Sequence, residues 1–131
     1  MIFVDANVPM YLVGADHPNK DAARRRLERA VVDAEPLATD AEVLQEILHR
    51  YVAINRRDAI PSAFAALLDV VDVVHPIELR DVQRARRLVV DGAGFSARDA
   101  IHAAVMTRYG IARILTFDTG FAAIDGVALY E

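Results

Sequence analysis

The sequence contains no cysteine, which excludes disulfide bonds and thiolate metal ligands. It also has no apolar run close to the roughly 18 residues that a membrane-spanning helix requires. Met1 leads into Asp5 instead of into the basic and apolar regions of a signal peptide. These absences predict a cytoplasmic protein with no membrane partner.

Lysine is almost missing as well, because Lys20 is the only one among the 15 basic residues. The net charge of -4 argues against a general nucleic-acid binder, since phosphate binding depends on clustered positive charge. Ten of the 14 arginines nevertheless lie in three groups, namely Arg24, Arg25, Arg26 and Arg29; Arg56 and Arg57; and Arg80, Arg84, Arg86 and Arg87. Such groups either hold phosphates with paired hydrogen bonds or form solvated helix faces beside acidic residues, and the pattern leaves both interpretations open.

The length of 131 residues is that of one domain, so a single domain over residues 1–131 is expected. The 54% hydrophobic and 26% charged residues are typical of a globular protein. Expected strands are 2–4, 37–39, 70–75, 113–116 and 127–130, and expected helices are 19–34, one beginning at Thr39, 58–69, 79–91 and 96–109. This alternation predicts an α/β fold of three α/β/α layers, with a central, mainly parallel five-stranded sheet.

Two of the expected helices have a clear apolar face. The first carries Ala23, Leu27, Ala30 and Val31 at helical spacing. The second begins with Thr39-Asp40-Ala41-Glu42, which has the form of a capping box. Its expected buried positions are Val43, Leu44, Ile47, Leu48 and Tyr51.

Asp5 is a charged residue directly after the buried run 2–4. A carboxylate at the end of a central strand needs a partner, because burying an unpaired charge costs free energy. In parallel α/β sheets the functional residues gather at the carboxyl ends of the strands. Asp118 follows the fourth strand, Asp99 lies in the first turn of the last helix, and Glu46 lies two turns into the helix after the second strand. Elements distant in sequence can therefore bring these carboxylates together.

Carboxylates this close repel one another and raise one another's pKa values unless a cation neutralises them. A site with oxygen ligands, no cysteine and few histidines favours a hard divalent ion, Mg²⁺ or Mn²⁺. The four histidines show no shared ligand spacing, and surface or core positions are expected for them: His17, His49, His75 and His102.

The acids also have structural interpretations. Asp99 fits the third position of a capping box, and Asp118 fits a turn before a glycine. Glu42 is better explained as the capping partner of Thr39. Glu46 lies ~60° from Val43 around the helix and Glu42 ~100°, so Glu46 is the better placed to reach a cleft.

Four short motifs carry a resemblance to a known family. They are Asp5-Ala6-Asn7 after the first strand, Val43-Leu44-Gln45-Glu46 after the second, Phe95-Ser96-Ala97-Arg98-Asp99-Ala100-Ile101-His102-Ala103-Ala104, and Leu115-Thr116-Phe117-Asp118. In order and spacing they resemble a PIN domain, and in particular the toxin half of VapBC toxin–antitoxin pairs. The resemblance covers nearly the whole chain.

The resemblance implies a Mg²⁺ or Mn²⁺ dependent endoribonuclease. Matched residue by residue, the acidic quartet falls on Asp5, Glu46, Asp99 and Asp118, and the supporting polar residues are Asn7, Ser96 and Thr116. Asp5, Asp99 and Asp118 are the expected metal ligands, whereas Glu46 either binds a second ion or orients the attacking water. Arg98 either contacts phosphate or forms a surface ion pair.

The same resemblance implies the toxin of a type II toxin–antitoxin pair, with a cognate antitoxin, an RNA substrate and a homodimer. Two alternatives stay open, a PIN-like nuclease in RNA maturation and a non-catalytic RNA- or protein-binding module. The intact acids argue against the second, because clustered negative charge beside RNA brings a binding protein no advantage.

Overall fold

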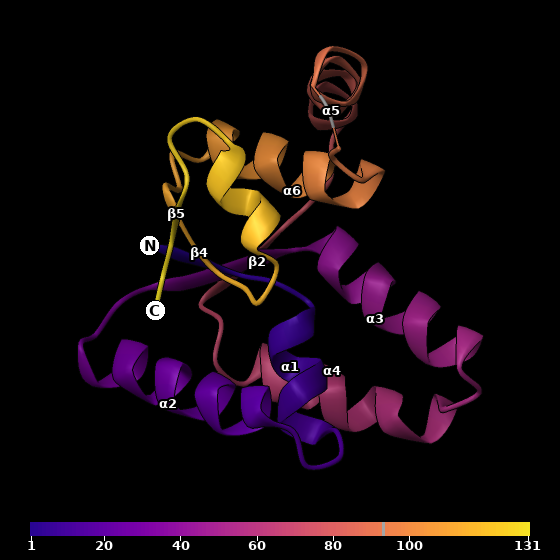
Figure 1. Ribbon diagram of the computed structural model, residues 1–131, viewed down its shortest axis with the longest axis vertical. Coiled ribbons are helices and arrows are strands. Elements are labelled where there is room, and N and C mark those ends of the chain that lie inside the picture. The colour runs from indigo at the N-terminus through magenta and orange to yellow at the C-terminus, as the bar shows by residue number, and fades with distance from the viewer. Residues whose placement is uncertain (93) are drawn as a thin grey trace.

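A parallel sheet lies at the centre of the structure (Figure 1). The computed structural model describes residues 1–92 and 94–131, and within them the strands are β1 (Ile2–Val4), β2 (Leu37–Asp40), β3 (Val73–His75), β4 (Arg113–Leu115) and β5 (Ala128–Leu129). They form one sheet of order β3-β2-β1-β4-β5. Each neighbouring pair runs parallel, so the predicted sheet is confirmed and is parallel throughout.

Helices cover both faces of this sheet. In the described residues they are α1 (Asn7–Val13), α2 (Pro18–Val32), α3 (Ala41–Ala53), α4 (Ile60–Leu68), α5 (Leu79–Asp91) and α6 (Ala97–Arg108), with short 3₁₀ turns η1 (Arg57–Ala59) and η2 (Thr119–Ala123). Figure 1 shows α5 and α6 on one side and α1, α2 and α4 on the other, which confirms the three layers. None of the helices in this part of the chain is long and apolar enough to cross a membrane.

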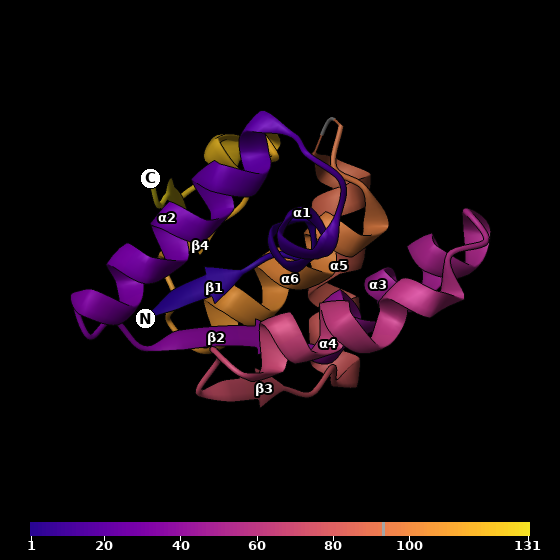
Figure 2. The same ribbon diagram turned by 90° about the horizontal axis from the view of Figure 1, so that it is seen from below.

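The middle strand explains why the sheet needs two covering layers. In β1, Ile2, Phe3 and Val4 are all fully buried, because helices cover both of its faces. Ile2 pairs with Leu37 of β2 on one side and with Arg113 of β4 on the other. Figure 2 shows the strands pointing toward α1 and α3, so their carboxyl ends share one edge of the sheet.

One helix was not predicted. Helix α1 begins at Asn7, directly after the first strand, and Val8 and Pro9 are buried in it. It has no side-chain cap at its start and no charged residue in its first or last turn, so the usual signals of a helix start are absent, although Gly14 ends it as a C-cap. The burial of its apolar residues against the core stabilises it instead.

The predicted capping box of Thr39 and Glu42 is wrong. Asp40 is the N-cap of α3, and its Oδ1 accepts a hydrogen bond from the Val43 N–H at 2.9 Å. Thr39 is the third residue of β2 and donates its hydroxyl to the Val4 carbonyl at 2.9 Å. The N-cap of α3 is therefore one residue later than predicted, at Asp40, which is also the last residue of β2.

Two further expectations need correction. The predicted strand 70–75 begins only at Val73, because the Val70 and Val71 N–H groups bond to the Leu67 carbonyl and continue the turn of α4. Among the expected buried residues, Val31 is 60% exposed and Leu48 is 43% exposed. Both lie at the edge of an apolar face that is narrower than the spacing suggested.

Candidate active site

Asp5 lies directly after β1 and is 4% exposed. Its Oδ1 accepts a hydrogen bond from the Ala6 N–H at 2.7 Å, and its Oδ2 accepts one from the Thr116 hydroxyl at 2.7 Å. Burial raises the pKa of Asp5, whereas the His102 ring and the Thr116 hydrogen bond lower it. The partner that the sequence required for this carboxylate is therefore supplied by the end of β4.

Thr116 connects three of the predicted site residues. Its Oγ1 donates to Asp5 and accepts hydrogen bonds from Asn7 Nδ2 at 3.1 Å and from the Asp118 N–H at 3.0 Å. Asn7 in turn accepts a bond from the Phe117 N–H at 3.3 Å. With its donor and both acceptor positions used, the hydroxyl has one orientation, which fixes the carboxylate of Asp5.

Asp99 lies in the first turn of α6, where its N–H donates to the Ser96 hydroxyl at 3.1 Å. The expected helix cap is thus present, and Ser96 acts on the backbone of Asp99. Burial, together with the charges of Asp5 and Asp118, raises the pKa of Asp99 to about 6. The three predicted metal ligands therefore influence one another electrostatically.

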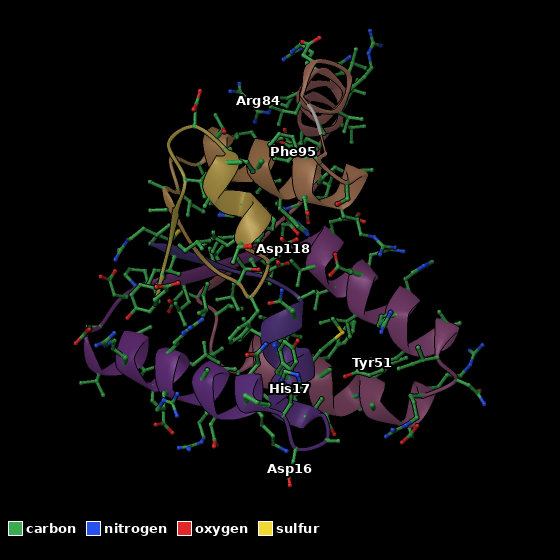
Figure 3. All side chains as sticks on the ribbon, in the orientation of Figure 1. Asp16, His17, Tyr51, Arg84, Phe95 and Asp118 are labelled. Carbon is green, nitrogen blue, oxygen red and sulfur yellow. The ribbon has the colours of Figure 1, made fainter. Side chains whose placement is uncertain are left out.

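Asp118 lies at the N-cap of η2 and is exposed. Its Oδ1 accepts a hydrogen bond from the Gly120 N–H at 2.9 Å, so the turn interpretation is correct as well. Figure 3 shows Asp118 beside the lower end of η2, between the two helix layers. Asp99 and Asp118 line one cavity of about 200 Å³ together with Phe95 and Phe121.

The two glutamates of α3 have different surroundings. Glu46 is half-buried, and its Oε1 lies 3.8 Å from the Nε2 of His102. Glu42 instead lies 3.5 Å from the Arg98 guanidinium, in a partly exposed ion pair. The choice of Glu46 over Glu42 agrees with this placement, although the capping argument for Glu42 was wrong.

His102 occupies one of the expected core positions, and its ring also lies beside two of the predicted site acids, Asp5 and Glu46. It is fully buried on α6, and its Nδ1 lies 2.8 Å from Asp40 Oδ2. Its Nε2 lies 3.9 Å from Asp5 Oδ1 and 3.8 Å from Glu46 Oε1. Burial alone lowers the pKa of His102, but the neighbouring carboxylates of Asp40, Glu46 and Asp5 raise it to about 10.

A sequence signal for His102 does exist. Asp99 and His102 are three residues apart, and this separation places two side chains on neighbouring positions of one helix face. A histidine three residues after a candidate metal ligand was therefore a candidate for the same site. The histidines were compared only with one another, and because no second histidine lies at ligand spacing, His102 was not predicted as a site residue.

The donor atoms of this region suit a divalent cation. One ligand atom each of Asp5, Glu46 and His102 lies within 4.8 Å of the other two. Two carboxylate oxygens and a ring nitrogen are ligands of divalent metal ions. Without a cation, the buried carboxylates keep the unfavourable environment that raises the pKa values of Asp5 and Asp99.

The fold and this acidic edge define a known class of protein. The sequence profile of the PIN domain family matches residues 2–127, and the chain belongs to this family. Within it the chain is similar to the VapC ribonucleases. Ribonuclease VapC13 of Mycobacterium tuberculosis is 56% identical over 127 residues, which cover 97% of each chain. The predicted resemblance is therefore confirmed.

Solved structures agree with this assignment. The crystal structure of VapC20 of Mycobacterium tuberculosis, a Sarcin-Ricin loop cleaving toxin, matches with a TM-score of 0.76 and 26% identity over 94% of each chain. The structure of VapBC2 from Rickettsia felis, bound to a DNA fragment from their promoter, matches with a TM-score of 0.73 and 16% identity. That match covers 98% of this chain and 97% of the other, and it shows the fold.

Proposed function

We propose that this protein is a metal-dependent endoribonuclease and the toxin of a VapBC-type pair. The observation that carries the proposal is the convergence of Asp5, Glu46 and Asp99 from three different elements on one edge of the sheet. The 56% identity to a VapC ribonuclease supports RNA as the substrate. A binding module would gain nothing from buried carboxylates that repel phosphate.

Each of these side chains has a proposed role. Asp5, Asp99 and Asp118 would hold Mg²⁺ or Mn²⁺, and Glu46 would hold a second ion or orient the attacking water. Asn7 and Thr116 keep Asp5 in place through their hydrogen bonds, and Ser96 keeps the first turn of α6 in place. The bound ion supplies a more acidic water and offsets the negative charge of the transition state.

The remaining proposals concern the surroundings of the enzyme. The VapBC2 structure among the solved relatives supports a cognate antitoxin. We place this antitoxin over the acidic edge and propose a homodimer of the toxin. The chain forms a single PIN domain over residues 1–131 and acts in the cytoplasm, where its RNA substrate is found. An arginine of the antitoxin is the side chain best suited to pair with the acids in place of metal and RNA, because its planar guanidinium can bind a carboxylate with two hydrogen bonds.

The proposed function is tested with purified variants and a matched control. Asp5→Asn and Asp99→Asn keep the shape of the side chain but remove charge, so we expect a sharp loss of metal binding and of RNA cleavage. Asp33→Asn makes the same change at the exposed end of α2, before the amino end of β2, and is expected to retain both. Full cleavage by folded Asp5→Asn protein would refute the mechanism.

The toxin role requires a separate test in cells. Expression of the wild-type chain alone in a bacterium is expected to arrest growth, whereas Asp99→Asn is expected to be tolerated. Sequencing of RNA 5′ ends after induction then identifies the cleaved RNA, for which single-stranded loops are the expected targets because their bases are accessible. Co-expression of the neighbouring gene product is expected to restore growth. Metal-dependent cleavage without arrest would leave a nuclease but refute the toxin role.

A further inference from the structure

His102 has one satisfied ring nitrogen and one unsatisfied ring nitrogen. Asp40 Oδ2 holds Nδ1 at 2.8 Å, and the other carboxylate oxygen of Asp40 caps α3 through the Val43 N–H. Both Asp40 oxygens are therefore engaged, and the imidazole has a fixed direction. The Nε2 atom is fully buried and has no hydrogen-bond partner among the described residues.

The unsatisfied Nε2 points into the acidic site. It lies 3.9 Å from Asp5 Oδ1 and 3.8 Å from Glu46 Oε1, which is too far for hydrogen bonds. Ligand atoms that share an ion at about 2.1 Å lie roughly 3 to 4 Å from one another. The observed separations therefore suit three ligands of one metal ion better than they suit direct contacts.

The chemistry of the ring agrees with this geometry. Asp40 Oδ2 accepts a hydrogen bond from the Nδ1–H group, so Nε2 is the ring nitrogen that faces Asp5 and Glu46. A metal ion bound through the Nε2 lone pair would displace the proton that the surrounding carboxylates favour on the ring. A histidine whose second nitrogen is bound to a carboxylate is the usual form of a metal-ligating histidine. Glu46 is the most exposed of these three groups, because 22% of its side chain is exposed compared with 5% for Asp5 and none for His102.

We propose that His102, oriented by Asp40, is a direct nitrogen ligand of the second divalent ion, the one assigned above to Glu46, and that Asp5 shares this ion. This inference rests on the proposed function because it concerns the same site. An imidazole ligand favours a transition-metal ion over Mg²⁺, which prefers oxygen ligands and water. The centre is therefore selective for Mn²⁺ over Mg²⁺. The competing explanation is a protonated ring that only holds the two carboxylates.

Pulsed electron paramagnetic resonance of Mn²⁺ added to the purified wild-type protein distinguishes these explanations. A directly bound imidazole is expected to give ¹⁴N coupling in the Mn²⁺ signal. In His102→Gln the coupling is expected to disappear, and the Kd for Mn²⁺ is expected to rise about 10-fold or more, with a smaller change for Mg²⁺. His49→Gln, at an exposed histidine of α3, is the matched control and is expected to keep both properties.

Two further measurements make the result independent of folding defects. Asp40→Ser keeps a side chain that can cap α3 but loses the bond to His102, so weaker ¹⁴N coupling is expected in a folded protein. RNA cleavage is measured on the same samples. Tight Mn²⁺ binding and cleavage without ¹⁴N coupling in the wild type would refute the ligand role and leave the nuclease. Coupling without cleavage would support the ligand role and refute the proposed function.

Discussion

Replacing Thr116 with valine tests whether its hydroxyl holds the site together. Thr116→Val keeps the β-branched shape and the volume but removes the donor to Asp5 and the acceptor for Asn7 and Asp118. A hydrogen bond to an ionised carboxylate contributes about 1.5–3 kcal/mol to stability. Water can replace the hydroxyl beside Asn7 and the Asp118 N–H, which are only partly buried, so these two bonds add about 1 kcal/mol or less.

The expected loss in the free energy of unfolding is therefore about 2–4 kcal/mol. The hydrogen bond from Thr116 lowers the pKa of Asp5, so its removal raises this pKa further and weakens metal binding at neutral pH. Urea unfolding of the metal-free protein measures the first effect, and a Mn²⁺ titration measures the second. Thr116→Ser, which keeps the hydroxyl, is expected to restore most of the metal affinity.

Thr107→Val is the matched control for this prediction. Thr107 is exposed near the end of α6, and its hydroxyl donates to the Ala103 carbonyl at 2.9 Å in the same helix. Its replacement is expected to cost about 1 kcal/mol or less and to leave metal binding unchanged. Equal losses for the two valine variants, or unchanged metal affinity in Thr116→Val, would refute the role assigned to Thr116.

Three further predictions follow from neighbouring contacts. Glu46→Gln is expected to lower cleavage with little change in Tm. Glu42→Gln is expected to keep cleavage and to lose only a partly exposed ion pair worth about 0–1 kcal/mol. The reverse pattern in activity and melting measurements would show that Glu42, not Glu46, is the functional acid. The pKa of Asp99 is raised to about 6 from 3.8, so metal affinity is expected to rise as the pH increases through 6. In the metal-free protein the same shift is expected to lower the free energy of unfolding as the pH rises from about 4 to 6. Flat pH profiles in metal titrations and in unfolding experiments would contradict this. Asp81→Ala leaves the Arg108 guanidinium, 2.8 Å away and 11% exposed, without its buried partner, and urea unfolding is expected to show a loss of about 3–5 kcal/mol.

The carboxylates of the site could be predicted from the sequence because parallel sheets impose a simple rule. Strand patterns place residues such as Asp5 and Asp118 after strands, and the carboxyl ends of parallel strands share one edge. The position of Asp99 followed from the helix start at Ser96. For these residues, the local sequence pattern and the parallel topology were enough to predict their positions in the fold.

Helix α1 and the start of α3 show where local patterns fail. Burial stabilises α1, whose sequence has no cap or charge signal. At the start of α3, both Thr39 and Asp40 can cap a helix, and local sequence does not distinguish them. The sheet decides between them, because the Thr39 hydroxyl bonds to Val4 on the neighbouring strand.

The sequence by itself determined the α/β class and the parallel sheet, because these depend on the periodicity of apolar residues. It predicted the four acids from their positions after strands and on the helices that follow. Only the tertiary structure brought His102 beside Asp5 and Glu46. Its partner Asp40 is 62 residues away in the chain, and their bond forms only when α6 packs beside the end of β2. The contact between His102 and Asp40 depends on how α6 packs against β2, so no local periodic pattern in the sequence indicates it.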